Sequence, residues 1–200
     1  MPECYADTSF FYESIPSPFG DVGVVWIQRN TAPSVVRIFL PGKGDTIARV
    51  ICREYPRAVK RSNRILGEMC NQIKEYMEGS IVKFSLELLD MGQCYNFQKN
   101  VLLKLRRIPR GKVVSYGQLA GETGAPGAAR ATGTALSGNP FPIILPCHRV
   151  VKSTGHPGHF GGGQELKEAL LRIEGVEVSA GGKIEQRYFL TCFDTAILSL

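Results

Sequence analysis

A cysteine and a histidine stand side by side in the run Ile143-Ile144-Leu145-Pro146-Cys147-His148-Arg149-Val150-Val151. A free thiol with a pKa near ~8.5 is mostly protonated at neutral pH, and it becomes a nucleophile when a basic or cationic neighbour favours the thiolate. His148 and Arg149 are such neighbours, and the apolar residues on both sides indicate a loop held against a core. The run therefore predicts one activated cysteine, Cys147.

The remaining cysteines and histidines do not suggest a metal site or a disulfide framework. The six cysteines, at 4, 52, 70, 94, 147 and 192, are scattered and form no C-x-x-C pair. A site made of Cys147, His156 and His159 falls short of four zinc ligands at normal spacing. We therefore expect a reducing compartment, no metal and no cofactor.

Positive charge is concentrated around Cys147. The chain carries a net charge of +6. Residues 99–152 contain nine basic residues and one acidic residue, Glu122. A solvated helix face at 104–112 accounts for only half of this cluster, and uneven positive charge favours a phosphate backbone as partner. We therefore expect the protein to bind nucleic acid. The basic residues are Lys99, Lys104, Arg106, Arg107, Arg110, Lys112, Arg130, Arg149 and Lys152.

The elements that must position this cysteine form two sections. In the first section, the spacing of apolar residues predicts strands at 22–28, 35–40 and 81–89 and a helix at 63–77. These elements indicate an α+β scaffold. No stretch approaches the ~20 apolar residues of a membrane span. Residues 1–7 lack a signal-peptide pattern, so we expect an intracellular protein: cytoplasmic in a prokaryote, nuclear in a eukaryote.

The second section is mainly helical. Apolar residues from Phe97 to Ile108 repeat every three or four positions, and Pro109-Arg110-Gly111 ends that helix. Ser115 is a plausible N-cap for a short helix to about residue 122. After a turn, a second helix at 128–136 has Arg130 as its one long side chain, which completes a helix-turn-helix arrangement. A further helix is predicted at 165–173, and the last residues show no motif.

Together these runs resemble one family, the O6-alkylguanine-DNA alkyltransferases, also called methylated-DNA–protein-cysteine methyltransferases. The resemblance is strong over residues 95–175. The matching runs, in the family's order, are Ile108-Pro109-x-Gly111, Ser115-Tyr116-Gly117-Gln118-Leu119-Ala120, Ala129-Arg130-Ala131, Gly138-Asn139-Pro140-x-Pro142-Ile143-x-x-Pro146-Cys147-His148-Arg149-Val150, and Leu170-Leu171-x-x-Glu174-Gly175.

The resemblance implies a fold with three parts. Residues 1–90 would form a small mixed α/β, ribonuclease H-like scaffold domain. Residues 91–178 would form a mainly helical, winged helix-turn-helix-like domain that carries the cysteine and binds DNA. The role of residues 179–200 stays open.

The implied function is direct-reversal DNA repair by an irreversible, single-turnover methyltransferase. An alkyl group would pass from O6 of guanine to Cys147 after the base flips out, because O6 lies inside the base stack. The expected partner is double-stranded DNA containing O6-alkylguanine, with O4-alkylthymine as an open second substrate. We expect a monomer that does not bind a membrane.

The resemblance also assigns roles to individual residues. Cys147 would be the nucleophile, and His148 its base through a water, oriented by Glu174 in a nucleophile–base–orienter arrangement. Asn139 would tie the preceding turn into the site, and Tyr116 would protonate the leaving guanine. The expected substrate-binding residues are Lys167, Val150, Phe160 and Gly161. The expected DNA-binding residues are Arg130, which would fill the gap left by the flipped base, with Ala128, Ala129, Thr132, Gly133 and Ser115.

Two positions depart from the family's pattern. Phe160 stands where tyrosine is common, and Gly161 where serine or alanine is common, so these departures bear on substrate range and rate more than on reaction type. Three alternatives remain open: a non-catalytic alkyltransferase-like lesion-binding protein, a DNA-binding regulator, and a cysteine hydrolase. Cys147 argues against the first, and hydrolases bring their histidine from far along the chain.

Overall fold

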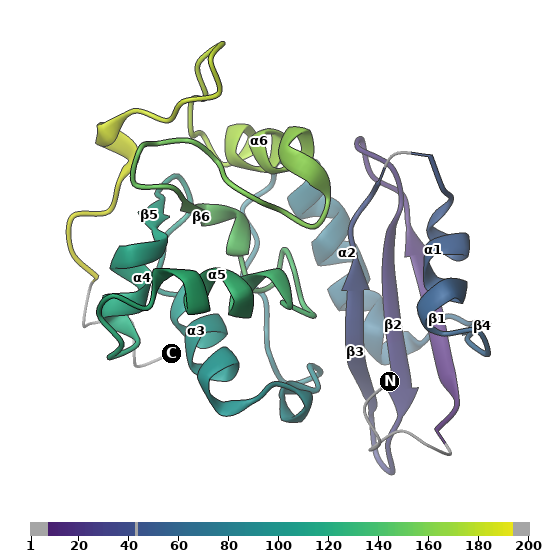
Figure 1. The fold of residues 1–200 in the computed structure, drawn as a ribbon. Coiled ribbons are helices and arrows are strands. Elements are labelled where there is room, and N and C mark those ends of the chain that lie inside the picture. The colour runs from purple at the N-terminus through teal and green to yellow at the C-terminus, as the bar shows by residue number, and fades with distance from the viewer. Residues whose placement is uncertain (1–7, 43, 194–200) are drawn as a thin grey trace. The chain divides into compact units, whose positions relative to one another are not determined.

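The computed structural model describes residues 8–42 and 44–193, which fall into two compact units (Figure 1). The first unit runs to Gln93 and also includes the short segment Pro140–Ile144, and the second comprises Cys94–Asn139 and the chain from Leu145 onward. Helices and strands occur together, so the predicted mixed α+β class is confirmed. No helix among the described residues is both long and apolar enough to cross a membrane.

The first unit is built on a four-stranded sheet with the order β3-β2-β1-β4. The first three strands are antiparallel neighbours, and β4 pairs with β1 in parallel. Its elements are β1 (Phe10–Ile15), β2 (Val22–Gln28), β3 (Pro33–Phe39), α1 (Ile47–Glu54), β4 (Val59–Lys60), α2 (Arg64–Met77) and a 3-10 turn at Met91–Gln93.

The two faces of this sheet carry different helices. Side chains alternate between the faces along a strand. Tyr12 belongs to a buried apolar cluster with Ile51 of α1, whereas Glu13 hydrogen-bonds Cys70 of α2. Covering both faces lets a short sheet bury most of its strand residues, which include the 1% exposed Trp26.

The structure confirms part of the sequence reading of this unit. The strands predicted at 22–28 and 35–40 and the helix at 63–77 correspond to β2, β3 and α2, while β1 and α1 had no predicted counterpart. The strand predicted at 81–89 is wrong, because that segment joins the sheet through a single bridge between Val35 and Leu89. Its side chains alternate in exposure, but alternation alone does not provide a neighbouring strand for a hydrogen-bonded ladder.

In the second unit two short helices, α4 and α5, follow one another along the chain. Ser115 caps α4 with a reciprocal pair of bonds: its hydroxyl accepts from Gln118 N–H (3.1 Å), and the Gln118 side chain accepts from Ser115 N–H (2.7 Å). α5 then packs against α3 and α4. The elements are α3 (Asn96–Leu105), β5 (Val114–Ser115), α4 (Tyr116–Glu122), α5 (Ala129–Ser137), β6 (Val150–Val151) and α6 (Gly163–Ile173), with 3-10 turns at Cys147–Arg149 and Gln186–Tyr188.

Helix α3 ends at Leu105, three residues before the predicted end at Ile108. The chain then turns through Gly111, whose φ of +80° lies in the left-handed region that glycine adopts without steric cost. A Cβ at this position would lie 3.2 Å from the Glu174 carbonyl oxygen. The glycine therefore allows this loop to approach the backbone at Glu174 closely.

The segment after residue 178 is part of the core of the second unit. Val113 forms a bridge with Phe189, and Val178 forms one with Ile184. Ile184 and Phe189 are buried in a cluster with Leu171 and other apolar residues. Residues 1–7 and 194–200, at the two ends of the expected domains, lie outside the described residues.

We predict that Phe189→Ala lowers the free energy of unfolding by about 3–5 kcal/mol, because it removes a buried aromatic ring and leaves a cavity. Urea unfolding of the purified variant measures this loss. Gln186→Ala, a change at an exposed position of the same segment, should stay within about 0.5 kcal/mol of the unmodified chain. Equal stabilities of the two variants would contradict the role of this segment in the core.

Candidate active site

Cys147 lies at the start of a 3-10 turn, Cys147–Arg149, which leads directly into β6. Only 8% of the residue is exposed. Burial raises the pKa of its thiol, while a hydrogen bond from the Asn139 side chain, the charge of Lys167 and the backbone N–H groups of Cys147 and His148 oppose that rise. The sulfur is thus buried but surrounded by donors and a cation that favour its anionic form.

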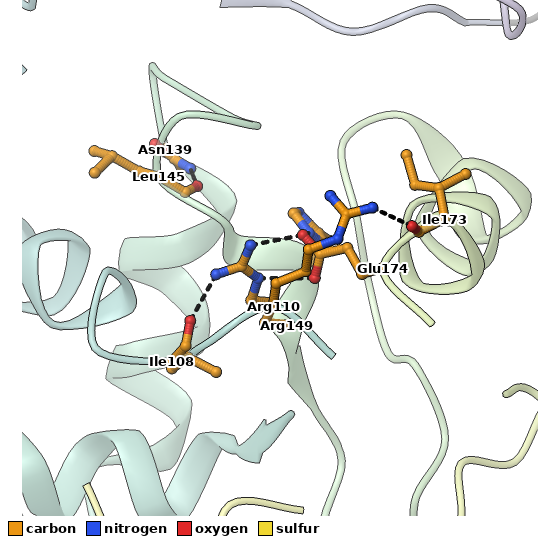
Figure 2. Close-up of polar contacts among 8 residues, drawn as sticks. Ile108, Arg110, Asn139, Leu145, Arg149, Ile173 and Glu174 are labelled. Atoms are coloured by element: carbon orange, nitrogen blue, oxygen red, sulfur yellow. Dashed lines mark hydrogen bonds and ion pairs between the residues drawn. The ribbon is translucent and has the colours of Figure 1, made fainter. Parts of the chain in front are cut away.

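The loop before Cys147 is closed by Asn139. Its side-chain Nδ2 donates to the Leu145 carbonyl oxygen at 2.9 Å (Figure 2). Between these residues Ile143 adopts a φ of +74°, which is unfavourable for a β-branched side chain and costs about 1–3 kcal/mol. Ile143 is nonetheless almost fully buried, so the packing of its side chain offsets the backbone strain.

His148 and Glu174 form a buried pair. The side chains of both residues have no exposed surface, and His148 Nε2 lies 3.1 Å from Glu174 Oε1. Burial lowers the pKa of His148, and the neighbouring carboxylate works in the opposite direction. Because an ionised carboxylate can only accept, the ring proton of a neutral His148 lies on Nε2 and Nδ1 carries the lone pair. His148 is therefore suited to accept a proton.

Arg149 holds the same carboxylate from the other side. Its Nε donates to Glu174 Oε2 at 2.8 Å and its Nη2 to Oε1 at 2.6 Å, while Nη1 donates to the Ile108 carbonyl oxygen at 2.6 Å (Figure 2). Arg110 donates to the carbonyl oxygen of Ile173, the residue before Glu174. Burial by itself raises the pKa of Glu174, but His148 and Arg149 hold that pKa well below its usual range.

The grip of Arg149 on Glu174 was not predicted from the sequence. Arg149 was expected only to add positive charge beside Cys147. Its partner Glu174 lies 25 residues further along the chain, and no local pattern indicates which of two adjacent side chains in a tight turn will reach a distant carboxylate. The weak signal available is an arginine next to the proposed base.

Lys167 is fully buried on α6 close to the cysteine. Its Nζ donates to the carbonyl oxygens of Val150 (2.6 Å) and Pro157 (2.5 Å) and lies 5.9 Å from the centre of the Phe160 ring. Burial lowers the pKa of this lysine to about 8, and the charge of Cys147 opposes the fall. The Phe160 ring also lies edge-on to His148, with 6.4 Å between ring centres. The structure therefore brings Lys167 together with Val150 and Phe160.

Tyr116 faces Cys147 from the first residue of α4. Burial and the nearby Cys147 anion both raise the pKa of its phenol. A Cβ at Gly158 would lie 3.1 Å from the Tyr116 hydroxyl oxygen, whereas nothing lies within 4 Å of a Cβ placed at Gly161. The glycine-rich loop therefore closely approaches the phenol at one glycine and leaves open space at the other.

The residues predicted to bind DNA differ in how far they are exposed to solvent. Arg130 is exposed on α5, and Ala128, Ala129 and Gly133 are half-buried. The prediction for Thr132 is wrong for its side chain: Thr132 is fully buried, because its position in the helical repeat turns it toward the protein. The Ser115 hydroxyl is occupied as the cap of α4. The exposed residues of α5 are Arg130, Ala131, Thr134 and Ser137.

Metal-ligand groups are not found in the part of the chain that the structure describes: no three His, Cys, Asp or Glu side chains there could hold an ion together. The chemistry available at the site is that of a buried thiol, an imidazole paired with a carboxylate, an ammonium group and a phenol.

Residues 96–176 match the family model described as "6-O-methylguanine DNA methyltransferase, DNA binding domain". Three similar proteins are each named methylated-DNA–protein-cysteine methyltransferase. The one from Methanothermobacter thermautotrophicus is 34% identical over 86% of this chain and 90% of its own length. The Mycolicibacterium paratuberculosis protein is 43% identical over 82% and 91%, and the human protein is 39% identical over 84% and 82%.

Solved structures give the same picture. The O6-methylguanine methyltransferase of Mycobacterium tuberculosis aligns with a TM-score of 0.65 at 32% identity, over 82% of this chain and 92% of its own. A crystal structure of the Mycobacterium tuberculosis protein in complex with DNA aligns with a TM-score of 0.63, at the same identity and coverage. The O6-methylguanine-DNA methyltransferase of Pyrococcus kodakaraensis aligns with a TM-score of 0.63 at 28% identity, over 84% of this chain and 99% of its own.

We predict that Glu174→Gln lowers the free energy of unfolding by about 3–5 kcal/mol at neutral pH, because it breaks a buried ion pair. The folded state lowers the pKa of Glu174, so the stability that this group adds is present above about pH 4.3 and is lost as pH falls. Urea unfolding at neutral and acidic pH should therefore show the gap between variant and parent shrinking in acid.

The matched control is Glu177→Gln, which breaks a surface pair with Arg187 and should cost at most about 1 kcal/mol. A gap between parent and Glu174→Gln that does not change with pH would contradict the charged state of Glu174 in the folded protein.

Proposed function

This chain belongs to the methylated-DNA–protein-cysteine methyltransferase family, and we propose that it repairs DNA by moving an alkyl group from O6 of guanine to Cys147 Sγ. The observation that carries the proposal is the buried Cys147 beside His148, whose imidazole is held by Glu174 at 3.1 Å. In the transfer the bond from the alkyl carbon to O6 breaks and a bond from that carbon to Sγ forms. The thiol loses a proton and the guanine gains one, so no cofactor is required.

His148 takes the proton from Cys147. The two residues are adjacent in a 3-10 turn, where neighbouring side chains diverge, so we propose that one water passes the proton to His148. Glu174 orients the imidazole and stabilises it once it is protonated, which is the nucleophile–base–orienter arrangement of activated nucleophiles. Asn139 and Lys167 stabilise the thiolate that forms.

Tyr116 supplies the proton that the leaving guanine needs. Its phenol pKa is raised by burial and by Cys147, so the group stays protonated until negative charge develops on the base. Phe160 and Val150 form the wall of the base pocket, and the open space at Gly161 gives the base room. Lys167 contacts both wall residues. The reaction happens once per molecule, because breaking the carbon–Sγ bond of the thioether would require a second nucleophile to take the alkyl group and a thiolate as a poor leaving group.

Double-stranded DNA is the proposed partner, approached by the exposed face of α5. Arg130 enters the duplex and fills the space left by the flipped base, while Ala128, Ala129 and Gly133 allow the helix backbone to come close to the groove. The Mycobacterium tuberculosis relative has been crystallised in complex with DNA, which supports this partner. Ser115 contributes through its place at the start of α4.

The finer fold assignment is also a proposal. We assign residues 1–90 to a ribonuclease H-like scaffold, and residues 91–178 to a winged helix-turn-helix-like domain that binds DNA. The α4–turn–α5 arrangement and the β5–β6 ladder support the second assignment. We further propose that the protein acts as a monomer where the DNA is, in the cytoplasm of a prokaryote or the nucleus of a eukaryote, with O4-alkylthymine as a second lesion to test.

We predict that incubation with DNA containing O6-methylguanine methylates the peptide that carries Cys147, in proportion to protein and without added cofactor. Peptide mass spectrometry measures the modification. Cys147→Ala should bind the same DNA yet transfer nothing. A lesion that persists while Cys147 remains unmodified would contradict the proposal and indicate a lesion-binding protein instead.

We predict that Arg130→Ala slows repair of duplex DNA at least about tenfold, which corresponds to about 1.4 kcal/mol of lost stabilisation of the flipped state. Its reaction with free O6-benzylguanine base should stay unchanged, because no base has to leave a stack. Single-turnover rates with both substrates measure the difference. Arg172→Ala, which removes an exposed charge on α6, is the control and should leave both rates near those of the parent. Equal losses on both substrates for Arg130→Ala would refute the flipping role.

A further inference from the structure

The Glu174 carboxylate is shared by two residues that are neighbours in the sequence. Its Oε1 accepts from both His148 Nε2 (3.1 Å) and Arg149 Nη2 (2.6 Å), and its Oε2 accepts from Arg149 Nε (2.8 Å). The shorter contacts are those of Arg149. The carboxylate therefore binds both side chains, and two of these three contacts are made by Arg149.

This sharing matters because of what a buried carboxylate does to an imidazole. An unscreened negative charge within hydrogen-bond distance favours the imidazolium, and an imidazolium cannot accept a proton from a thiol. A guanidinium that binds the carboxylate bidentately offsets part of that effect, in the same direction as the burial of the imidazole. Glu174 can then orient the His148 ring while the ring stays in its neutral form.

Arg149 is itself held in place. Its Nη1 donates to the Ile108 carbonyl oxygen at 2.6 Å, and only 14% of its side chain is exposed. The residue also belongs to the turn that carries Cys147 and His148. A single short segment thus supplies the nucleophile, the base and the cation that controls the base.

Resting on the function proposed above, we infer that Arg149 is a positioning residue: it fixes the Glu174 carboxylate and keeps the His148 imidazole neutral, ready to accept the Cys147 proton.

The charged and titratable groups around His148 support this reading. Glu174 and Lys167 face it from α6, and Cys147 and Arg149 flank it in its own turn. Phe160, from the loop before α6, contributes an uncharged ring. Burial lowers the pKa of His148, Glu174 opposes this, and the charges of Arg149 and Lys167 lower it further. Arg149 is the cation that also touches the carboxylate.

The decisive variant is Arg149→Gln, which removes the charge and keeps a polar side chain. Without Arg149, His148 and Glu174 together bind a proton more readily, whichever of the two carries it. The acidic limb of the pH–rate profile should therefore move upward by about one pH unit. On that limb the single-turnover rate with free O6-benzylguanine should fall about tenfold, and it should return to near the parental rate in alkaline buffer.

Arg107→Gln is the matched control. Arg107 is as deeply buried in the same unit, with 10% of its side chain exposed, and it pairs with Glu122 at 3.0 Å. Its loss should destabilise the protein without moving the acidic limb. The free base as substrate removes DNA binding from the comparison.

Two further variants separate positioning from simple loss of structure. Arg149→Lys keeps the charge without the two-pronged contact, so it should restore most of the limb position but only part of the rate. In a Glu174→Gln background, Arg149→Gln should move the limb by clearly less, because the carboxylate contact is gone and only the direct effect of the Arg149 charge on His148 remains.

A rate for Arg149→Gln that falls equally at every pH would overturn the inference and leave the proposed function intact. A limb shift of the same size in the Glu174→Gln background would also overturn it. If the parent chain transfers no alkyl group at any pH while Cys147 still reacts with iodoacetamide, the proposed function itself fails.

Discussion

A carboxylate with no exposed side-chain surface has to be neutralised by fixed partners, and in this protein that group is Glu174. Burying a charge is costly unless it is paired and hydrogen-bonded, so the chain brings an imidazole and a guanidinium to it from one short turn. Gly111 lets a neighbouring loop approach the backbone at this point, and Arg110 binds the preceding carbonyl group. The geometry of Cys147 and His148 follows from this arrangement, because both lie on the turn that Arg149 anchors.

The nucleophile is governed by the same balance of burial and pairing. Removing Cys147 from water disfavours its anion, and Asn139, Lys167 and two backbone N–H groups counter that effect. Lys167 is in turn fixed by hydrogen bonds to two carbonyl oxygens, so its charge stays close to Cys147. A thiol in such surroundings has its anion disfavoured by burial and favoured by fixed neighbours, so its ionisation depends on these neighbours staying in place.

Much of this could be predicted from the sequence where the signal is local. The cap of α4 lies in the four residues Ser115 to Gln118, and Cys147 and His148 are contiguous. Glu174 was reached only through resemblance to a family, because nothing in its own segment connects it to a histidine 26 residues away. The strand expected at 81–89 failed for a non-local reason, namely the lack of a partner for its ladder. Thr132 was grouped with Arg130 through the family resemblance, whereas its place in the helical repeat turns its side chain inward.

The burial of Ile184 and Phe189 has a consequence for how the protein is made. The N–H and carbonyl groups of Val113, just before β5 and α4, bond to Tyr188 and Leu190, and the Gln118 side chain donates to Leu190. During synthesis from the N-terminus, α4 and α5 are therefore made about fifty to seventy residues before the segment that completes their core. The reactive turn at Cys147 is translated within that interval. A nascent chain thus carries its cysteine before the segment that completes the core of this unit has been made.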